Sequence, residues 1–287
     1  MEIQVILFGV VTSIVAALLL IGLLGARWLP LAVAFGVFGA HWLLKKTPPP
    51  LPHELWSNGN GVAWTMWGVV AAALVALLER LRVLPQRLGQ IGGAAVAVFA
   101  VYLVLEKVAS RWSQLDVWLY VGGGGVLAIA TVLALRTVLT RAPQPTDARW
   151  SWVAVLFLVL LSLDAGLVVE GGKTAFAAQL CGAVAAALGA GVGLGVLFRS
   201  RAVTLAPADA AWLGTAHVLF LTGAVHLNQL PWLSAAPALA APLALLALPK
   251  ELGKRQPWRW FAVAAAIVVL LHGTAMMLLP AADPSGY

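Results

Sequence analysis

Long apolar segments, separated by short polar turns, run along almost the whole chain. When charged residues, proline clusters and turn residues are taken as boundaries, ten segments are apolar enough to be membrane-spanning helices. They cover residues 3–26, 29–44, 61–78, 91–106, 116–135, 150–169, 174–198, 209–227, 231–248 and 258–279. A hydrocarbon core about 30 Å thick requires roughly 20 mostly apolar residues per helix. The pattern therefore predicts an all-α, polytopic transmembrane helix bundle of about ten spans, with no soluble domain.

The first two segments decide where the N-terminus lies. The first is too long for the apolar part of a signal peptide and no basic region precedes it, so we expect it to be retained as a helix. The second, 29–44, is short and is followed by Lys45 and Lys46. If it re-enters the membrane instead of crossing it, the chain has nine spans and its N-terminus lies on the inner side.

Composition supports a single membrane domain. Apolar residues make up 62% of the chain and charged residues 10%, against roughly 45–50% and about 25% in soluble domains. The connections are too short for a catalytic domain, so we expect residues 1–287 to form one integral membrane domain. Ten spans also divide into halves of five, 1–141 and 149–287, as in inverted-repeat transporters. We find no residue-level match between these halves, so the division depends on the span count.

The charge pattern predicts an orientation. Formal net charge is +7, and the odd-numbered loops hold 13 of the 18 Lys and Arg residues. Cytoplasmic loops retain such residues, so we expect loops 136–149 and 250–258 to face the cytoplasm and loop 48–60 to face outside. Both termini then lie on the periplasmic side of a cell inner membrane. The loops lack aromatic residues interleaved with basic ones, so we do not expect nucleic acid as a partner.

In length and span count the chain resembles the drug/metabolite transporter superfamily, whose members are ten-helix proteins built from two five-helix halves. The resemblance is architectural. It carries no motif residues, and members of that superfamily usually keep both termini in the cytoplasm, unlike the orientation expected here.

Few polar side chains lie inside the apolar segments, where each is costly to place. They gather in the outer halves of the even-numbered spans. We predict that Asp164, His217 and His272, with Gln179 and His41, form an intramembrane polar site open to the outer side. Such a group could exchange protons with a moving solute. Two alternatives stay open: metal or haem ligation by the histidines, and separate hydrogen bonds that fix helix pairs.

Small residues predict where helices pack closely. Gly182, Ala186, Gly189 and Gly193 recur at intervals of three or four and share one face, which we expect to lie against a helix of this chain or of a partner. The run 122–125 consists of four glycines, which favours either close packing or an unwound turn. Two prolines in segment 231–248 are expected to bend it.

Enzyme patterns are missing from the sequence. His53-Glu54 begins like a zinc protease motif, but Ser57 stands where the second histidine is required. We interpret Glu79 and Arg80 as an ordinary charged helix end, and we expect no enzyme, no cofactor and no metal site. The leading hypothesis is a small-solute permease or transport-related protein in the lipid bilayer, and the alternative is a non-transporting subunit or scaffold that packs against partner helices. A solvent-reachable cavity containing Asp164 would favour the first, and a solid core with an exposed glycine face the second.

Overall fold

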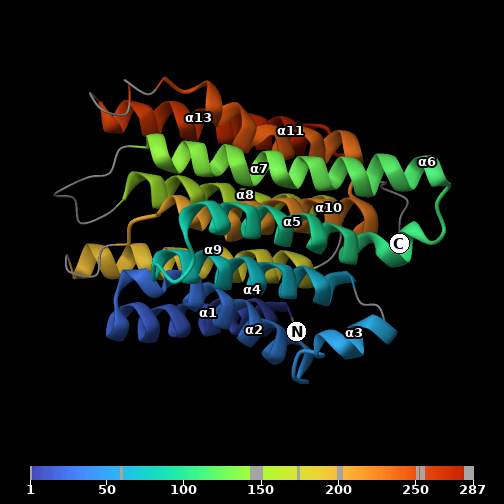
Figure 1. The fold of residues 1–287 in the computed structure, drawn as a ribbon, viewed down its shortest axis with the longest axis horizontal. Coiled ribbons are helices and arrows are strands. Elements are labelled where there is room, and N and C mark those ends of the chain that lie inside the picture. Colours follow the sequence, from blue (N-terminus) through green and yellow to red (C-terminus); the bar gives the residue numbers. More distant parts are fainter. Residues whose placement is uncertain are drawn as a thin grey trace.

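The protein is described by a computed structural model covering residues 2–58, 61–142, 151–172, 175–198, 203–249, 252 and 256–280. In this part of the chain every regular element is a helix, and the long helices run along the long axis of the molecule (Figure 1). In order the elements are α1 Glu2–Leu24, η1 Ala26–Trp28, α2 Leu29–Lys45, α3 Pro52–Asn58, α4 Gly61–Arg80, α5 Gln86–Ala109, α6 Gln114–Val117, η2 Trp118–Gly122, α7 Gly123–Arg141, α8 Trp152–Gly172, α9 Ala175–Leu197, η4 Pro207–Asp209, α10 Ala210–Asn228, α11 Trp232–Ala244, η5 Leu245–Ala247 and α13 Pro257–Met277.

The fold class predicted from the apolar pattern is confirmed. Each of the ten predicted segments contains a helix. Among the described residues, eight helical segments are long and apolar enough to cross a membrane. The second segment is one of them, because η1 extends it to the 20 residues of Ala26–Lys45, about 30 Å at 1.5 Å per residue. These helices identify the chain as a membrane protein.

Eight is fewer than the ten spans predicted. The first and ninth segments contribute shorter apolar helices, at Val10–Leu24 and Trp232–Ala247. In the first segment, α1 begins at Glu2, but the structure describes side chains only from Val10 onward. In the ninth, the α-helix ends two residues after Pro242 and a 3-10 turn follows. The helical part of the ninth segment, Trp232–Ala247, extends roughly 24 Å at 1.5 Å per residue. This length is less than the ~30 Å hydrocarbon core.

Several loop residues used to predict orientation are not described. Lys173, Arg199 and Arg201 lie outside the described residues, as do most of loop 250–258 and the part of loop 136–149 from residue 143 onward. The described connections alternate between the two ends of the bundle: α3 and α6, from the second and fourth loops, lie at the same end (Figure 1). The side of the membrane that this end faces stays a prediction.

Helix α10 lies at the centre of the bundle. Within its spanning segment, 83% of the residues are buried, and it packs against α4, α5, α7 and α8. Close approach depends on glycines at the contacts. A Cβ atom at Gly214 of α10 would lie 3.2 Å from the backbone of Val132 on α7, and one at Gly93 of α5 would lie 2.8 Å from the Ala211 side chain. The small residues therefore let α10 sit among its neighbours.

The chain stays helical through the run of four glycines, so the unwound turn is not seen there and the close packing is. A π-helical turn, Trp118–Gly122, directly precedes α7, which starts at the second glycine and continues as regular α-helix. A Cβ atom at Gly124 would lie 3.0 Å from Val101 of α5, and one at Gly125 would lie 3.4 Å from Val98. The last two glycines thus serve close packing of α7 on α5.

Candidate functional site

Asp164, His217 and His272 come from three different helices and meet in the interior of the bundle. Asp164 Oδ2 lies 2.8 Å from His217 Nδ1, and Asp164 Oδ1 lies 2.9 Å from His272 Nε2. Asp164 is on α8, His217 on α10 and His272 on α13, and α8 packs against both of the other helices. One carboxylate therefore ties together three helices that are far apart in sequence.

The cluster is enclosed. Asp164 and His217 have no exposed surface and His272 is 1% exposed. Leu167, Leu221 and Ala275, one turn along their helices from these three residues, are buried in one hydrophobic cluster. The site therefore does not open to the outer side as the sequence predicted, since apolar side chains fill the space next to it.

The hydrogen-bond partners of His272 show where one proton of the cluster lies. The carbonyl oxygen of Val268 only accepts hydrogen bonds, so His272 Nδ1, 2.9 Å away, must donate to it. His272 Nε2 then either donates to an ionised Asp164 or accepts from a protonated Asp164. In both forms one proton lies between Asp164 Oδ1 and His272 Nε2. The cluster thus holds a proton that the carboxylate and the imidazole share.

His217 makes the second contact of the carboxylate, 2.8 Å from its Nδ1 to Asp164 Oδ2. We assign Nδ1 as the donor, because the proton described above lies on the Oδ1 side of the carboxylate, and this tautomer leaves the lone pair on Nε2. This Nε2 is a buried nitrogen without a hydrogen-bond partner among the described residues. With His217 neutral, the cluster has a net charge of zero.

Gln179 and His41 do not join this cluster. Gln179 is half-buried on α9, His41 is buried on α2, and the described hydrogen-bond partners of Asp164 are the two other histidines. Helix α2 packs mainly on α1, α4 and α9. A shared depth in the membrane was therefore not enough to predict which side chains meet.

The geometry does not favour a metal centre at the described residues. No group of three His, Cys, Asp or Glu side chains there is arranged to hold a metal ion. In the Asp164 cluster, one nitrogen of each histidine is directed at a carboxylate oxygen, and the second nitrogen of His272 is bonded to Val268. These contacts suit a proton-holding group.

The small-residue face of α9 is only partly covered. A Cβ atom at Gly189 would lie 3.5 Å from Leu158 of α8, whereas at Gly182 and Gly193 it would meet nothing within 4 Å. These glycines and Ala186 line a groove of about 580 Å³ between α1, α8 and α9. Within the described part of the chain, this face thus remains open to the surroundings.

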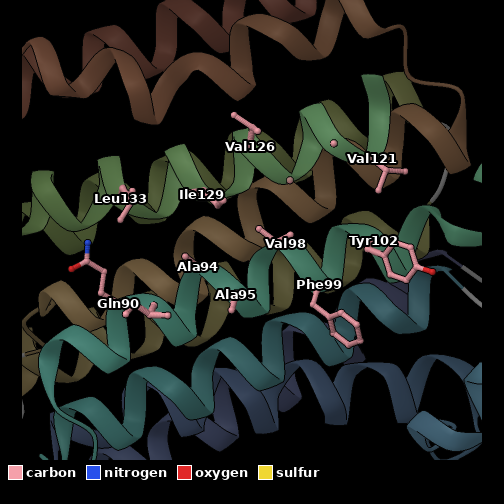
Figure 2. Close-up of a pocket in the computed structure, with 13 residues that line it drawn as sticks. Gln90, Ala94, Ala95, Val98, Phe99, Tyr102, Val121, Val126, Ile129 and Leu133 are labelled. Atoms are coloured by element: carbon pink, nitrogen blue, oxygen red, sulfur yellow. The ribbon is translucent and has the colours of Figure 1, made fainter. Parts of the chain in front are cut away.

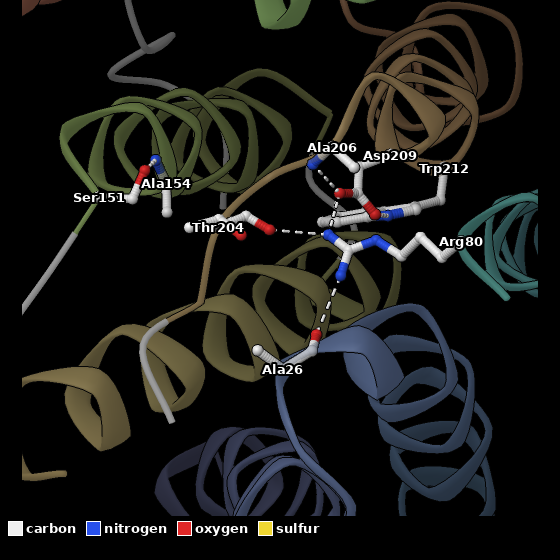
Figure 3. Close-up of polar contacts among 8 residues, drawn as sticks. All are labelled: Ala26, Arg80, Ser151, Ala154, Thr204, Ala206, Asp209 and Trp212. Carbon is white, nitrogen blue, oxygen red and sulfur yellow. Dashed lines mark hydrogen bonds and ion pairs between the residues drawn. The ribbon is translucent and has the colours of Figure 1, made fainter. Parts of the chain in front are cut away.

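A second buried polar group lies where α4 ends and η4 leads into α10 (Figure 3). Arg80, the last residue of α4, forms an ion pair with Asp209, and their side chains are 7% and 0% exposed. Arg80 Nη1 also donates to the Ala26 carbonyl and Nη2 to the Thr204 carbonyl, each at 2.9 Å. One guanidinium therefore connects α4, the turn after α1 and the segment before α10.

Asp209 completes this group. Its Oδ2 accepts the Ala206 backbone N–H at 2.6 Å, and its Oδ1 accepts the Trp212 indole N–H at 2.9 Å. Next to it, Arg136 Nη2 lies 2.5 Å from Glu79 Oε1. Every oxygen of Asp209 therefore has a partner, which is the condition for burying a carboxylate.

The interpretation of Glu79 and Arg80 as an ordinary helix end was wrong. Helix α4 includes both residues, and both side chains turn inward to partners on α7 and η4. The sequence held one usable signal, since Asp209 is an acidic residue at the start of the apolar segment 209–227, on the side where basic residues predominate. Its partner, however, is 129 positions away.

No protein-family model, curated protein or solved structure matches this chain.

Proposed function

We propose that this protein is a multi-pass inner-membrane permease for a small solute, in which the Asp164 cluster binds and releases the coupling proton. The observation that carries the proposal is the carboxylate of Asp164 between two histidines, with no exposed surface and an unfilled nitrogen on His217. Ionisable residues within membrane helices are rare and typically mark proton relays or substrate pathways. The proposal assigns no catalysis to the chain.

The enclosed cluster corresponds to one state of such a cycle. For His217 Nε2 to gain a proton, water or a solute must reach it, which requires α10 to move relative to α8 or α13. The three helices are joined at this level through a single carboxylate. Rearrangement of the two hydrogen bonds would therefore couple protonation to helix movement.

Proton coupling is tested in liposomes that enclose a pH-sensitive dye. Purified protein is reconstituted, a panel of small solutes is added outside one at a time, and the internal pH is followed. We expect at least one solute to produce a pH change with wild type and none with Asp164→Asn. Asp116→Asn is the matched control, since Asp116 is a half-buried carboxylate outside the Asp164 cluster that accepts a hydrogen bond from Ser113, the N-cap residue of the short helix α6. A response that survives in Asp164→Asn would refute the assignment of the proton site.

A non-transporting membrane subunit is the second candidate. It is favoured by the enclosed core around Asp164 and by the open face at Gly182 and Gly193. In that case wild-type liposomes give no pH response to any solute. A stoichiometric membrane partner then co-purifies with wild type and is lost from Gly193→Leu, whose side chain would fill the groove.

A further inference from the structure

A groove of about 910 Å³ runs along the surface of the bundle between α5 and α7 (Figure 2). Small residues line it: Ala94 and Ala95 on α5, Gly122 at the end of η2, and Gly125 on α7. The hollow exists because these side chains extend no further than Cβ. The exposed side chains of Phe99 and Val126 also border it, so the groove is apolar along its length.

The two ends of the groove differ from its middle. Figure 2 shows the Gln90 amide between α5 and α7 at one end and the Tyr102 ring near the other. Along α5 these two residues are separated by roughly 18 Å at 1.5 Å per residue. A groove of this length, parallel to the membrane-spanning helices, matches one leaflet's acyl chain better than a compact solute, because the hydrocarbon core is about 30 Å thick in total.

A cation lies at the Gln90 end. Arg87 precedes Gln90, Ile91 and Ala94 on α5 by three, four and seven residues, and these spacings place it on the same helix face as the groove. Its side chain is exposed. The predicted orientation places this end at the cytoplasmic surface, where anionic headgroups attract basic side chains.

We infer that the groove binds an anionic phospholipid. The phosphate accepts hydrogen bonds from the Arg87 guanidinium and the Gln90 amide. One acyl chain lies along the small residues of the groove, which are Ala94, Ala95, Gly122 and Gly125. A second copy of this chain fits less well. A symmetric pair within the membrane would bring two Arg87 side chains to the same depth across the contact, where like charges repel.

Native mass spectrometry in a mild detergent tests the inference, with phosphatidylglycerol and phosphatidylcholine as probes. We expect phosphatidylglycerol to bind about fivefold more tightly, because each basic residue near anionic lipid contributes about 1 kcal/mol. Arg87→Gln should remove this preference, while Arg82→Gln in the preceding turn should keep it. Gly122→Leu, which fills the groove, should lower the affinity for phosphatidylglycerol at least tenfold.

Gly123→Leu is the matched control for filling. A Cβ atom at Gly123 meets nothing within 4 Å, and this residue does not line the groove. Both positions have right-handed helical backbone, so the leucines should be tolerated equally. The inference is overturned if both lipids bind equally to wild type, or if Gly122→Leu binds phosphatidylglycerol as Gly123→Leu does. It is also overturned if Gly122→Leu converts a dimer to a monomer without losing bound lipid, since the groove then belongs to a second copy.

Discussion

Replacing Asp164 by Asn should leave the protein folded, while replacing it by Ala should destabilise it strongly. An asparagine retains both contacts. Its oxygen accepts from His217 Nδ1, and its NH₂ group donates to His272 Nε2, whose Nδ1 proton is held by Val268. All three side chains are then neutral and paired, as in the neutral form of the native cluster. The difference is that no proton is shared.

The expected magnitudes follow from the hydrogen bonds. Hydrogen bonds to charged groups contribute about 1.5–3 kcal/mol and neutral ones about 0.5–1.5. Asp164 makes two such bonds, so Asp164→Asn should lower the free energy of unfolding by at most about 2–3 kcal/mol, and by less where the native carboxyl is already protonated. Asp164→Ala leaves two fully buried imidazoles without their partner. Removing one member of a buried charged group typically costs about 3–5 kcal/mol. We therefore expect the alanine variant to be clearly the less stable of the two.

Unfolding in a mild detergent measures both effects, and nitrogen NMR of labelled histidines reports the imidazole protonation. In Asp164→Asn, both imidazoles should be neutral, with His272 protonated on Nδ1. If the asparagine variant is as unstable as the alanine variant, then the charge of the carboxylate holds the helices and the shared proton is assigned wrongly. If a histidine of the asparagine variant stays doubly protonated at neutral pH, the neutral arrangement is refuted.

Three further predictions concern other parts of the fold. Asp209→Asn leaves the arginine it pairs with as an unpaired buried charge and should destabilise the protein by about 3–5 kcal/mol in the same unfolding assay; stability equal to wild type would show that the pair is dispensable. Gly191→Ala should destabilise the protein by roughly 1–3 kcal/mol, because the added Cβ would lie 2.9 Å from the Val203 side chain. Gly193→Ala adds a Cβ that meets nothing within 4 Å, so it should be neutral or stabilising. Equal melting temperatures of the two variants would contradict the packing of α9. Arg82→Cys in a Cys181→Ala background should resist a membrane-impermeant thiol reagent in intact cells, and rapid labelling would reverse the predicted orientation.

Much of the fold was predictable because the bilayer imposes a simple rule: each span must be apolar along its length. Most segment boundaries therefore appeared in the sequence within a few residues, although α5 begins five residues before the predicted start and α7 ends six residues after the predicted end. The ninth segment was predicted to span the membrane, but its helix is too short. The sequence alone does not show whether a helix bends at Pro242 or ends soon after it. The extension of α4 to Arg80 was also missed, because a charge at a segment end normally faces water.

The candidate site was partly predictable for a related reason. Asp164 is costly in an apolar segment, which marks it for attention whatever its neighbours are. Depth along a span follows from residue number, but the direction in which a side chain points depends on the rotation of its helix. For this reason the sequence grouped Asp164, His217 and His272 correctly. It also added Gln179 and His41, which have the same depth but do not contact the cluster.

The central position of α10 also has a consequence for the order in which the helices assemble. Arg80 and Asp209 are separated by 129 positions, and α5, α7, α8 and α9 are synthesised between them. During that time the arginine has no carboxylate to bind. The span that contains α10 is less apolar than the span that contains α8 and is the more buried of the two, so α10 is better suited to an assembly of earlier helices than to bare lipid. We therefore expect α10 to insert among the helices made before it, and its pairing through Asp209 with Arg80 to complete the centre of the bundle.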